Sequence, residues 1–147
     1  MMNELGMDFY LTGGTALSRA YYHHRFSDDL DYFTHNNPEF LKHVKVFLGA
    51  LNDSGQYQID PKIAPQMNQG FSRLFIQSTR KNDDVLLKID FVNDIPVYYG
   101  EMIEDKVFGK LDNVENILIN KITALTRFEP KDIADIWMIS KNNTFIC

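Results

Sequence analysis

The segment between Met7 and Thr34 constrains the fold most, because it joins a strand, a glycine turn, a helix and a second strand with few residues between them. "MDFYLTGG" predicts a short strand that ends at Gly13–Gly14. Apolar residues then recur at helical spacing, at Ala16, Leu17, Ala20 and Tyr21, and Thr15 is the predicted N-cap. "LDYFTH" predicts the second strand. A chain with this pattern folds around a sheet with a helix packed beside it.

The rest of the chain adds helices and strands in an irregular order. Pro38 precedes a predicted helix that runs to about Leu51. Strands are predicted over 56–63, 71–79 and 85–92, and the turn "RKNDD" joins the last two. Two predicted helices, 113–128 and 131–141, are separated at Pro130. The sequence therefore predicts one α/β (α+β) domain over residues 1–147, with a short mixed β-sheet flanked by helices.

Composition excludes several kinds of protein. The net charge of −5 gives no overall attraction to nucleic acid. Cys147 is the only cysteine, which excludes a disulfide framework and a cysteine-based zinc site. The apolar runs are too short to span a bilayer, and the N-terminus shows no secretory signal. We expect a cytoplasmic protein that makes no contact with membranes.

The glycine pair Gly13–Gly14 is a candidate phosphate site. Glycine lets the backbone approach a ligand closely, and a helix N-terminus offers free N–H groups and the positive end of its dipole. The alternative is a tight strand-to-helix turn that binds nothing. The pair alone does not decide between the two.

Asp29 and Asp31 form a candidate metal site. Residues two apart in a strand face the same side, so these carboxylates point together and repel unless a cation lies between them. Mg²⁺ is held by one or two such carboxylates together with phosphate oxygens. The alternative is an edge strand with a charged, solvated face.

A third carboxylate, Asp90, lies in the predicted strand "VLLKIDFV". Alternation puts it on the polar face with Lys88, so it either completes a metal site or forms an ion pair with that lysine. Asp94, just beyond the strand, is the second choice.

Lys121 lies in the middle of an apolar stripe on the predicted helix 113–128. A lysine in that position extends its side chain to solvent, pairs with an acid, or reaches into a cleft where it would bind phosphate.

Together these features resemble a known family. "GGTALSRAYYHHRFSDDLD" is similar to the first motif of the polymerase-β-like nucleotidyltransferase superfamily, in which a glycine turn precedes an Asp-x-Asp pair by one helix. Its Gly-Gly-Thr followed by Arg-x-Ser-x-Asp-Leu-Asp resembles the AbiEii/AbiGii-type toxin branch, and falls on Gly13, Gly14, Thr15, Arg25, Ser27, Asp29 and Asp31. "NKITALTRFEPKDIADIW" resembles a later motif of the same branch, Lys-x-x-Ala-Leu-x-x-Arg followed by Lys/Arg-Asp-x-x-Asp.

The resemblance implies a metal-dependent nucleotidyltransferase that moves NMP from an NTP to an acceptor hydroxyl and releases pyrophosphate. It implies catalytic roles for Asp29, Asp31, Asp90, Lys121 and Asp132, of which the first three would hold two Mg²⁺ ions. Nucleotide binding would fall to Gly13, Gly14, Thr15, Arg25, Ser27 and Lys121. Arg127 and Asp135 would support the site.

The family also implies a toxin of a toxin–antitoxin or phage-defence system, with tRNA as acceptor and a cognate antitoxin as partner. Its members usually continue into further helices, so we expect this chain to lack the C-terminal helical part of longer relatives. Two alternatives stay open. One is transfer to a small molecule such as an aminoglycoside, which the acidic net charge favours. The other is a non-catalytic nucleotide-binding or partner-binding domain of the same fold.

Overall fold

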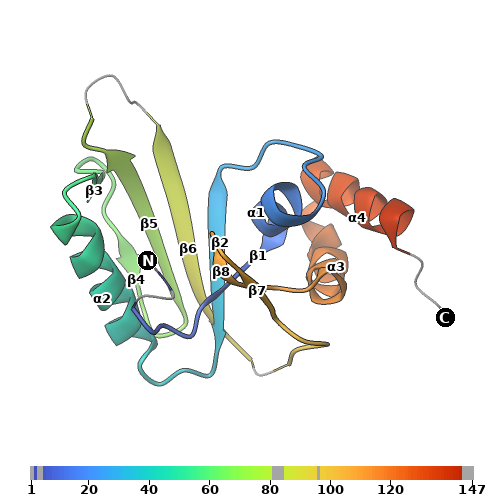
Figure 1. Cartoon of the computed structure of the whole chain (residues 1–147), viewed down its shortest axis with the longest axis horizontal. Helices are drawn as coiled ribbons and strands as arrows, with labels where there is room; N and C mark the ends of the chain where they lie inside the picture. Colours follow the sequence, from blue (N-terminus) through green and yellow to red (C-terminus); the bar gives the residue numbers. More distant parts are fainter. Residues whose placement is uncertain (1, 3–4, 81–84, 96, 144–147) are drawn as a thin grey trace.

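The computed structural model describes residues 2, 5–80, 85–95 and 97–143, which form one eight-stranded mixed sheet with helices packed against it (Figure 1). The strand order is β3-β5-β6-β2-β1-β8-β7, and β4 pairs with β5 outside this row. In chain order the elements are β1 (Tyr10–Thr12), α1 (Gly13–Thr15), the π-helical η1 (Ala16–Tyr21), β2 (Asp29–His35), α2 (Phe40–Asp53), β3 (Tyr57–Ile59), β4 (Gln66–Met67), β5 (Phe71–Ser78), β6 (Leu86–Asp94), β7 (Ile103–Asp105), β8 (Gly109–Leu111), α3 (Val114–Thr123), the 3₁₀ turn η2 (Ala124–Arg127) and α4 (Pro130–Asn142). The predicted mixed sheet flanked by helices is confirmed.

Parallel and antiparallel pairs alternate near the middle of the sheet. β2 runs parallel to β6 and antiparallel to β1, while β5 runs antiparallel to β6. The register places Asp31 between Thr12 on one side and Asp90 on the other. Residues far apart in the sequence therefore meet on one face of the sheet.

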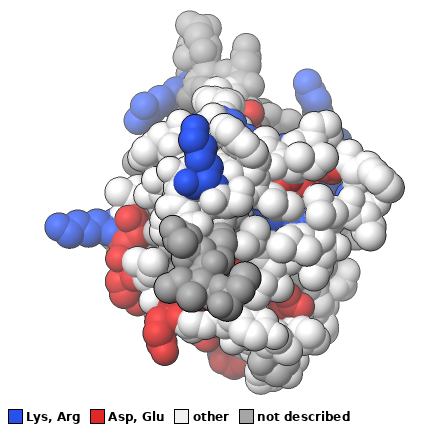
Figure 2. Space-filling model, turned by 90° about the vertical axis from the view of Figure 1, so that its right-hand side faces the viewer, with Lys and Arg blue, Asp and Glu red and all other residues white. Residues whose placement is uncertain are grey.

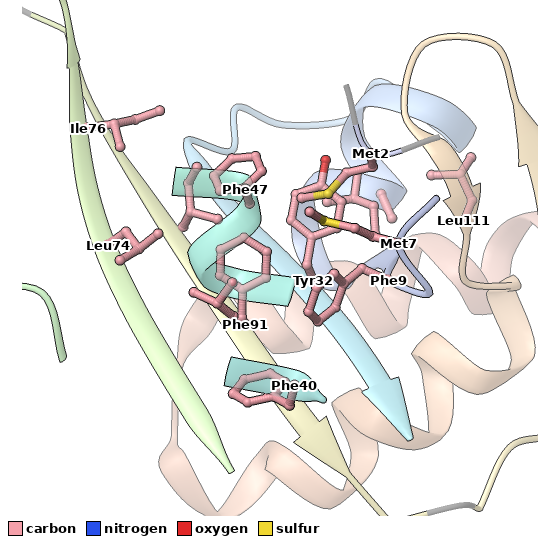
Figure 3. Close-up of a cluster of buried hydrophobic side chains, with 14 of the residues drawn as sticks. Met2, Met7, Phe9, Tyr32, Phe40, Phe47, Leu74, Ile76, Phe91 and Leu111 are labelled. Carbon is pink, nitrogen blue, oxygen red and sulfur yellow. The ribbon is translucent and has the colours of Figure 1, made fainter. Parts of the chain in front are cut away.

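The other face of these strands carries the hydrophobic core under α2. Alternate residues of β5 and β6 turn inward, including Leu74, Ile89 and Phe91. Figure 3 shows Phe40 and Phe47 among these side chains, and the Phe47 and Phe91 ring centroids are 5.3 Å apart. Burial of this face fixes which residues of β2 and β6 remain on the opposite side for chemistry.

The remaining helices gather at the opposite end of the sheet from α2 (Figure 1). α1 and η1 follow β1 directly, and α3 packs against α4. Leu17, Ile117 and Ile139 are buried where these helices meet the rest of the domain. No described helix is long and apolar enough to cross a membrane.

Several predicted boundaries are wrong. The helix predicted over 113–128 stops at Thr123, continues as a 3₁₀ turn and ends at Phe128, whose φ of +54° is left-handed. The strand predicted over 56–63 shrinks to β3, and β4, β7 and β8 were not predicted because each has only two or three residues. Most of the predicted turn at 80–84 lies outside the described residues.

Candidate active site

Gly13 and Gly14 bring the backbone against two charged side chains. Gly13 has a φ of +71°, and a Cβ atom there would lie 2.7 Å from Oδ2 of Asp31. A Cβ atom at Gly14 would lie 2.1 Å from Nη2 of Arg25. Any larger residue would displace Asp31 or Arg25, so close approach explains both glycines.

Thr15 ties the first helix to β2. The helix begins at Gly13, two positions before the predicted cap, and Thr15 makes no side-chain capping bond. Its hydroxyl instead donates to the backbone carbonyl of Asp29 and lies 2.9 Å from the hydroxyl of Ser27. The predicted capping role of the Thr15 side chain is therefore wrong, because its hydroxyl bonds to the first residue of β2 and not to the helix.

Asp29, Asp31 and Asp90 lie on the face of the central strands that α2 does not cover. Asp31 stands opposite Asp90 in the β2–β6 register, and Asp29 stands opposite Lys88. Burial raises the pKa of Asp31 most, the Asp90 carboxylate raises it further, and Lys88 partly offsets the shift. Carboxylates crowded in this way attract a cation.

Two basic side chains neutralise these acids. Nζ of Lys88 lies 2.8 Å from Asp29 and 3.7 Å from Asp90. Arg73 stands opposite Asp90 on β5 and donates to both of its oxygens through Nε and Nη2, each at 2.7 Å. These hydrogen bonds raise the pKa of Arg73. Asp90 therefore does form an ion pair, but Arg73 is its closer partner and Lys88 the more distant one.

The donor set suits Mg²⁺ as far as the described residues show. No three His, Cys, Asp or Glu side chains among them lie close enough together to hold one ion. Mg²⁺ does not need such a cage, because it usually takes one or two carboxylates and completes its shell with water and phosphate. Asp29, Asp31 and Asp90 fit that requirement on one shared face.

Lys121 bridges two acids of α4. It is 8% exposed, and its Nζ lies 2.6 Å from Asp132 and 2.8 Å from Asp135. Of the three alternatives for this lysine, pairing with an acid is observed, and the side chain also lines a cleft. The apolar stripe expected around it is incomplete, since Ile122 and Phe128 are exposed.

Asp132 is buried and completes this arrangement. Its second carboxylate oxygen accepts from Nη2 of Arg127 at 3.2 Å. Asp132 thus orients both Lys121 and Arg127.

Asp135 of α4 holds the loop between η1 and β2. Its buried carboxylate accepts from Nε and Nη2 of Arg25, each at 2.7 Å, and Nε2 of His24 lies 2.8 Å away. Burial alone would raise the pKa of Asp135, but hydrogen bonds from Arg25 and Lys121 lower it to about 2. Arg25 is therefore held beside Gly14 by Asp135.

The predicted site residues line two adjoining cavities of one cleft. The first, of about 370 Å³, is polar and has Gly14, Arg25, Ser27, Asp29, Lys88 and Asp132 in its wall. The second, of about 450 Å³, adds Gly13 and the apolar side chains Phe33, Phe71 and Val92. Asp31, Asp90, Arg73, Lys121 and Arg127 line both. Thr15 differs, because it lines neither of these cavities; it is buried and lines a separate one with Arg19 and Phe108.

Sequence reasoning missed Arg73 and Phe71 and gave Asp135 only a supporting role. Arg73 looked like a solvated charge on a strand. The usable signal was alternation, since Phe71 and Arg73 occupy the outward positions of "FSRLFIQST" and pair with β6.

Charge on the α3–α4 side of the molecule is scattered. Figure 2 shows Lys and Arg at separate points among residues of neither sign, with acidic residues grouped elsewhere. The visible described residues of this side form no continuous basic area. The visible part of this side therefore offers a polyanion no extended basic surface.

Comparison with known proteins identifies relatives. A family model described as "Nucleotidyl transferase AbiEii toxin, Type IV TA system" matches residues 2–146. The crystal structure of JHP933 from Helicobacter pylori is similar to this chain, with a TM-score of 0.64 and 22% identity over 95% of this chain and 61% of that one. A second H. pylori structure, described provisionally as a nucleotidyltransferase, gives a TM-score of 0.55 and 24% identity over 82% of this chain and 52% of that one. No curated protein matches.

These comparisons agree with the observed architecture. The chain spans about half to three fifths of the length of the two solved structures. At these identities the likeness shows the fold, a polymerase-β-like mixed sheet flanked by helices.

Proposed function

Because the chain belongs to the AbiEii nucleotidyltransferase toxin family, we propose that it moves a nucleoside monophosphate from an NTP to an acceptor hydroxyl and releases pyrophosphate. The observation that carries this proposal is that Asp29 and Asp31 of β2 share one face of the sheet with Asp90 of the neighbouring strand β6, which stands opposite Asp31. The Gly13–Gly14 turn and Lys121 stand at the same cleft. Two other cavities among the described residues lack this combination, since one has no acid and the other no glycine.

The first cavity is the proposed site of the triphosphate. The backbone at Gly14, in its wall, and at Gly13, which borders the adjoining second cavity, would approach the outer phosphates, and Ser27 would donate a hydrogen bond to them. Arg25 would use the N–H groups that Asp135 and the backbone carbonyl of Phe26 leave free. Thr15 would hold the backbone of Asp29 in position.

Asp29, Asp31 and Asp90 would hold two Mg²⁺ ions. When bound, Mg²⁺ neutralises charge on the phosphates and lowers the pKa of an acceptor hydroxyl. The acceptor oxygen would form a bond to the α-phosphorus as the bond to the β-phosphate breaks. A cleft carboxylate would accept the hydroxyl proton, and this role would fall to Asp90.

Lys121 would bind the departing phosphates. Asp132 would position this lysine, because it fixes Nζ at 2.6 Å from Oδ1. The ammonium group of Lys121 would supply positive charge where pyrophosphate leaves, as lysines do in other phosphoryl-transfer sites.

We propose the 3′ end of a tRNA as the acceptor and a cognate antitoxin as the partner, within the cytoplasm and in a phage-defence setting. The family model's type IV toxin–antitoxin description supports the antitoxin. A cationic small molecule such as an aminoglycoside is the second candidate acceptor, because the net charge of −5 favours it.

Incubation with each α-³²P-labelled NTP, Mg²⁺ and total tRNA tests the proposal. Label on tRNA that is lost in Asp29→Asn supports it. Label on kanamycin but not on tRNA would support the second candidate. If the wild-type chain transfers no label and Mg²⁺-dependent NTP binding is unaffected by Asp29→Asn, the proposed site is wrong and a non-catalytic domain is the better account.

A further inference from the structure

The second cavity has a role that the phosphate-binding residues do not explain. It is lined by an apolar row across three strands, formed by Phe33, Val92 and Phe71, which the register places side by side. This row lies next to the row of Asp31, Asp90 and Arg73. An apolar shelf beside a charged centre suits a ligand with a flat ring close to its reacting group.

Reaction geometry assigns a side to each cavity. In-line displacement places the attacking oxygen and the leaving pyrophosphate on opposite sides of the α-phosphorus. Gly14, Arg25 and Ser27 mark the pyrophosphate side, in the first cavity. The strands then run from β2 through β6 to β5, so Phe71 lies across Asp90 from that side, and Arg73 lies where the two cavities adjoin. The attacking group therefore enters from the second cavity.

Phe71 and Arg73 form a composite surface there. The guanidinium carbon of Arg73 lies 5.2 Å from the centre of the Phe71 ring. Asp90 accepts one hydrogen bond from Nε and one from Nη2 of Arg73, and no other described residue accepts a hydrogen bond from this guanidinium. Three of its five N–H groups thus remain for a ligand. The Arg73 side chain is 39% exposed, so a ligand can reach it.

We propose that Phe71 and Arg73 form the acceptor subsite, in which Phe71 stacks against the last unpaired base of an RNA and Arg73 contacts the phosphate that precedes it. This inference rests on the proposed function. Unpaired bases stack on aromatic rings and on guanidinium planes, and phosphates bind Arg. The apolar row beside the unused N–H groups of Arg73 suits a base next to a phosphate, which an RNA has and an aminoglycoside lacks.

The test uses Phe71→Ala, because changing Arg73 would also leave Asp90 without its partner. Phe75→Ala is the matched control, since Phe75 is the same residue type on the same face of β5, and it lines neither of the two cavities. Phe71→Tyr keeps the ring. The probe is a fluorescent RNA hairpin with a four-nucleotide 3′ overhang, compared with the blunt hairpin, and NTP binding is measured in parallel.

Phe71→Ala should weaken binding of the overhang RNA about tenfold and raise its KM in transfer by a similar factor, the size expected for loss of a stacking platform. Binding of NTP, and all values for Phe75→Ala and Phe71→Tyr, should stay near wild type. The proposal is overturned if RNA binding is unchanged in Phe71→Ala, or if the wild-type chain does not distinguish overhang RNA from blunt RNA. It is also overturned if Phe71→Ala weakens NTP binding instead, because the nucleoside of the NTP would then lie against Phe71. Phe71-dependent RNA binding without any nucleotidyl transfer would keep the subsite and refute the proposed function.

Discussion

Asp135 gives the sharpest test of how the site is held together. Asp135→Asn keeps the shape of the side chain but removes the charge that faces Arg25, Lys121 and His24. The pKa of about 2, against an ordinary 3.8, means that neutralising this carboxyl costs about 2 kcal/mol. For a domain of this length, that loss lowers Tm by roughly 4–8 °C.

Thermal unfolding followed by circular dichroism at about pH 7 measures the effect. Asp53→Asn is the control, because Asp53 is exposed at the end of α2. The pH dependence follows from the direction of the shift. Since the pKa of Asp135 is lower in the folded chain, its contribution is present above about pH 4 and is lost as the pH falls through about 2. The Tm difference between wild type and Asp135→Asn should therefore shrink as the pH falls below about 4. A difference that stays constant down to about pH 2.5, or one no larger than that of Asp53→Asn, would refute the reasoning.

Three further changes have defined outcomes. Gly14→Ala should lower the unfolding free energy in urea by about 1–3 kcal/mol, because its Cβ atom would meet Nη2 of Arg25 at 2.1 Å. The control Gly49→Ala, in open space on α2, should raise the unfolding free energy by up to about 1 kcal/mol. Equal effects of the two substitutions would contradict the close approach at Gly14. Asp31→Asn should raise the unfolding free energy at pH 7, because burial and Asp90 raise the pKa of Asp31 and make its ionised form unfavourable. The same substitution should abolish Mg²⁺-dependent NTP binding. A lower unfolding free energy in urea would count against this account. Phe91→Ala should cost about 3–5 kcal/mol in the same assay, because Phe91 is fully buried against Phe9, Tyr32 and Phe47, and a cost below about 1 kcal/mol would show that the core repacks.

Local patterns predicted the parts of the site that depend on spacing along one element. The glycine turn was visible as two residues between a strand and a helix. The shared face of Asp29 and Asp31 followed from the two-residue period of a strand. Asp90 was visible because a carboxylate interrupts an apolar strand. Each of these signals lies within ten residues, where sequence alone fixes geometry.

Partners across elements were not predictable from one sequence. Arg73 reaches Asp90 only because β5 and β6 pair in one register, and a shift of one residue would turn Arg73 into the core. The contact of Arg25 with Asp135 depends on how α4 packs against α1, which no local pattern encodes. The short strands β7 and β8 were not predicted for another reason: three residues carry too little periodicity to be distinguished from a loop.

The link between Arg25 and Asp135 has a consequence for the order in which the protein matures. The two residues are 110 positions apart, and Lys121 also lies far beyond the acids of the sheet. While a ribosome is still extending the chain, the strands that carry Asp29, Asp31 and Asp90 can emerge and pair before α3 and α4 exist. The nascent protein would then have the three aspartates of the sheet without Lys121 and without the hydrogen bonds from Arg25 to Asp135. The nucleotidyl transfer proposed above would therefore begin only after synthesis has passed α4, and translation products that stop earlier would lack that activity.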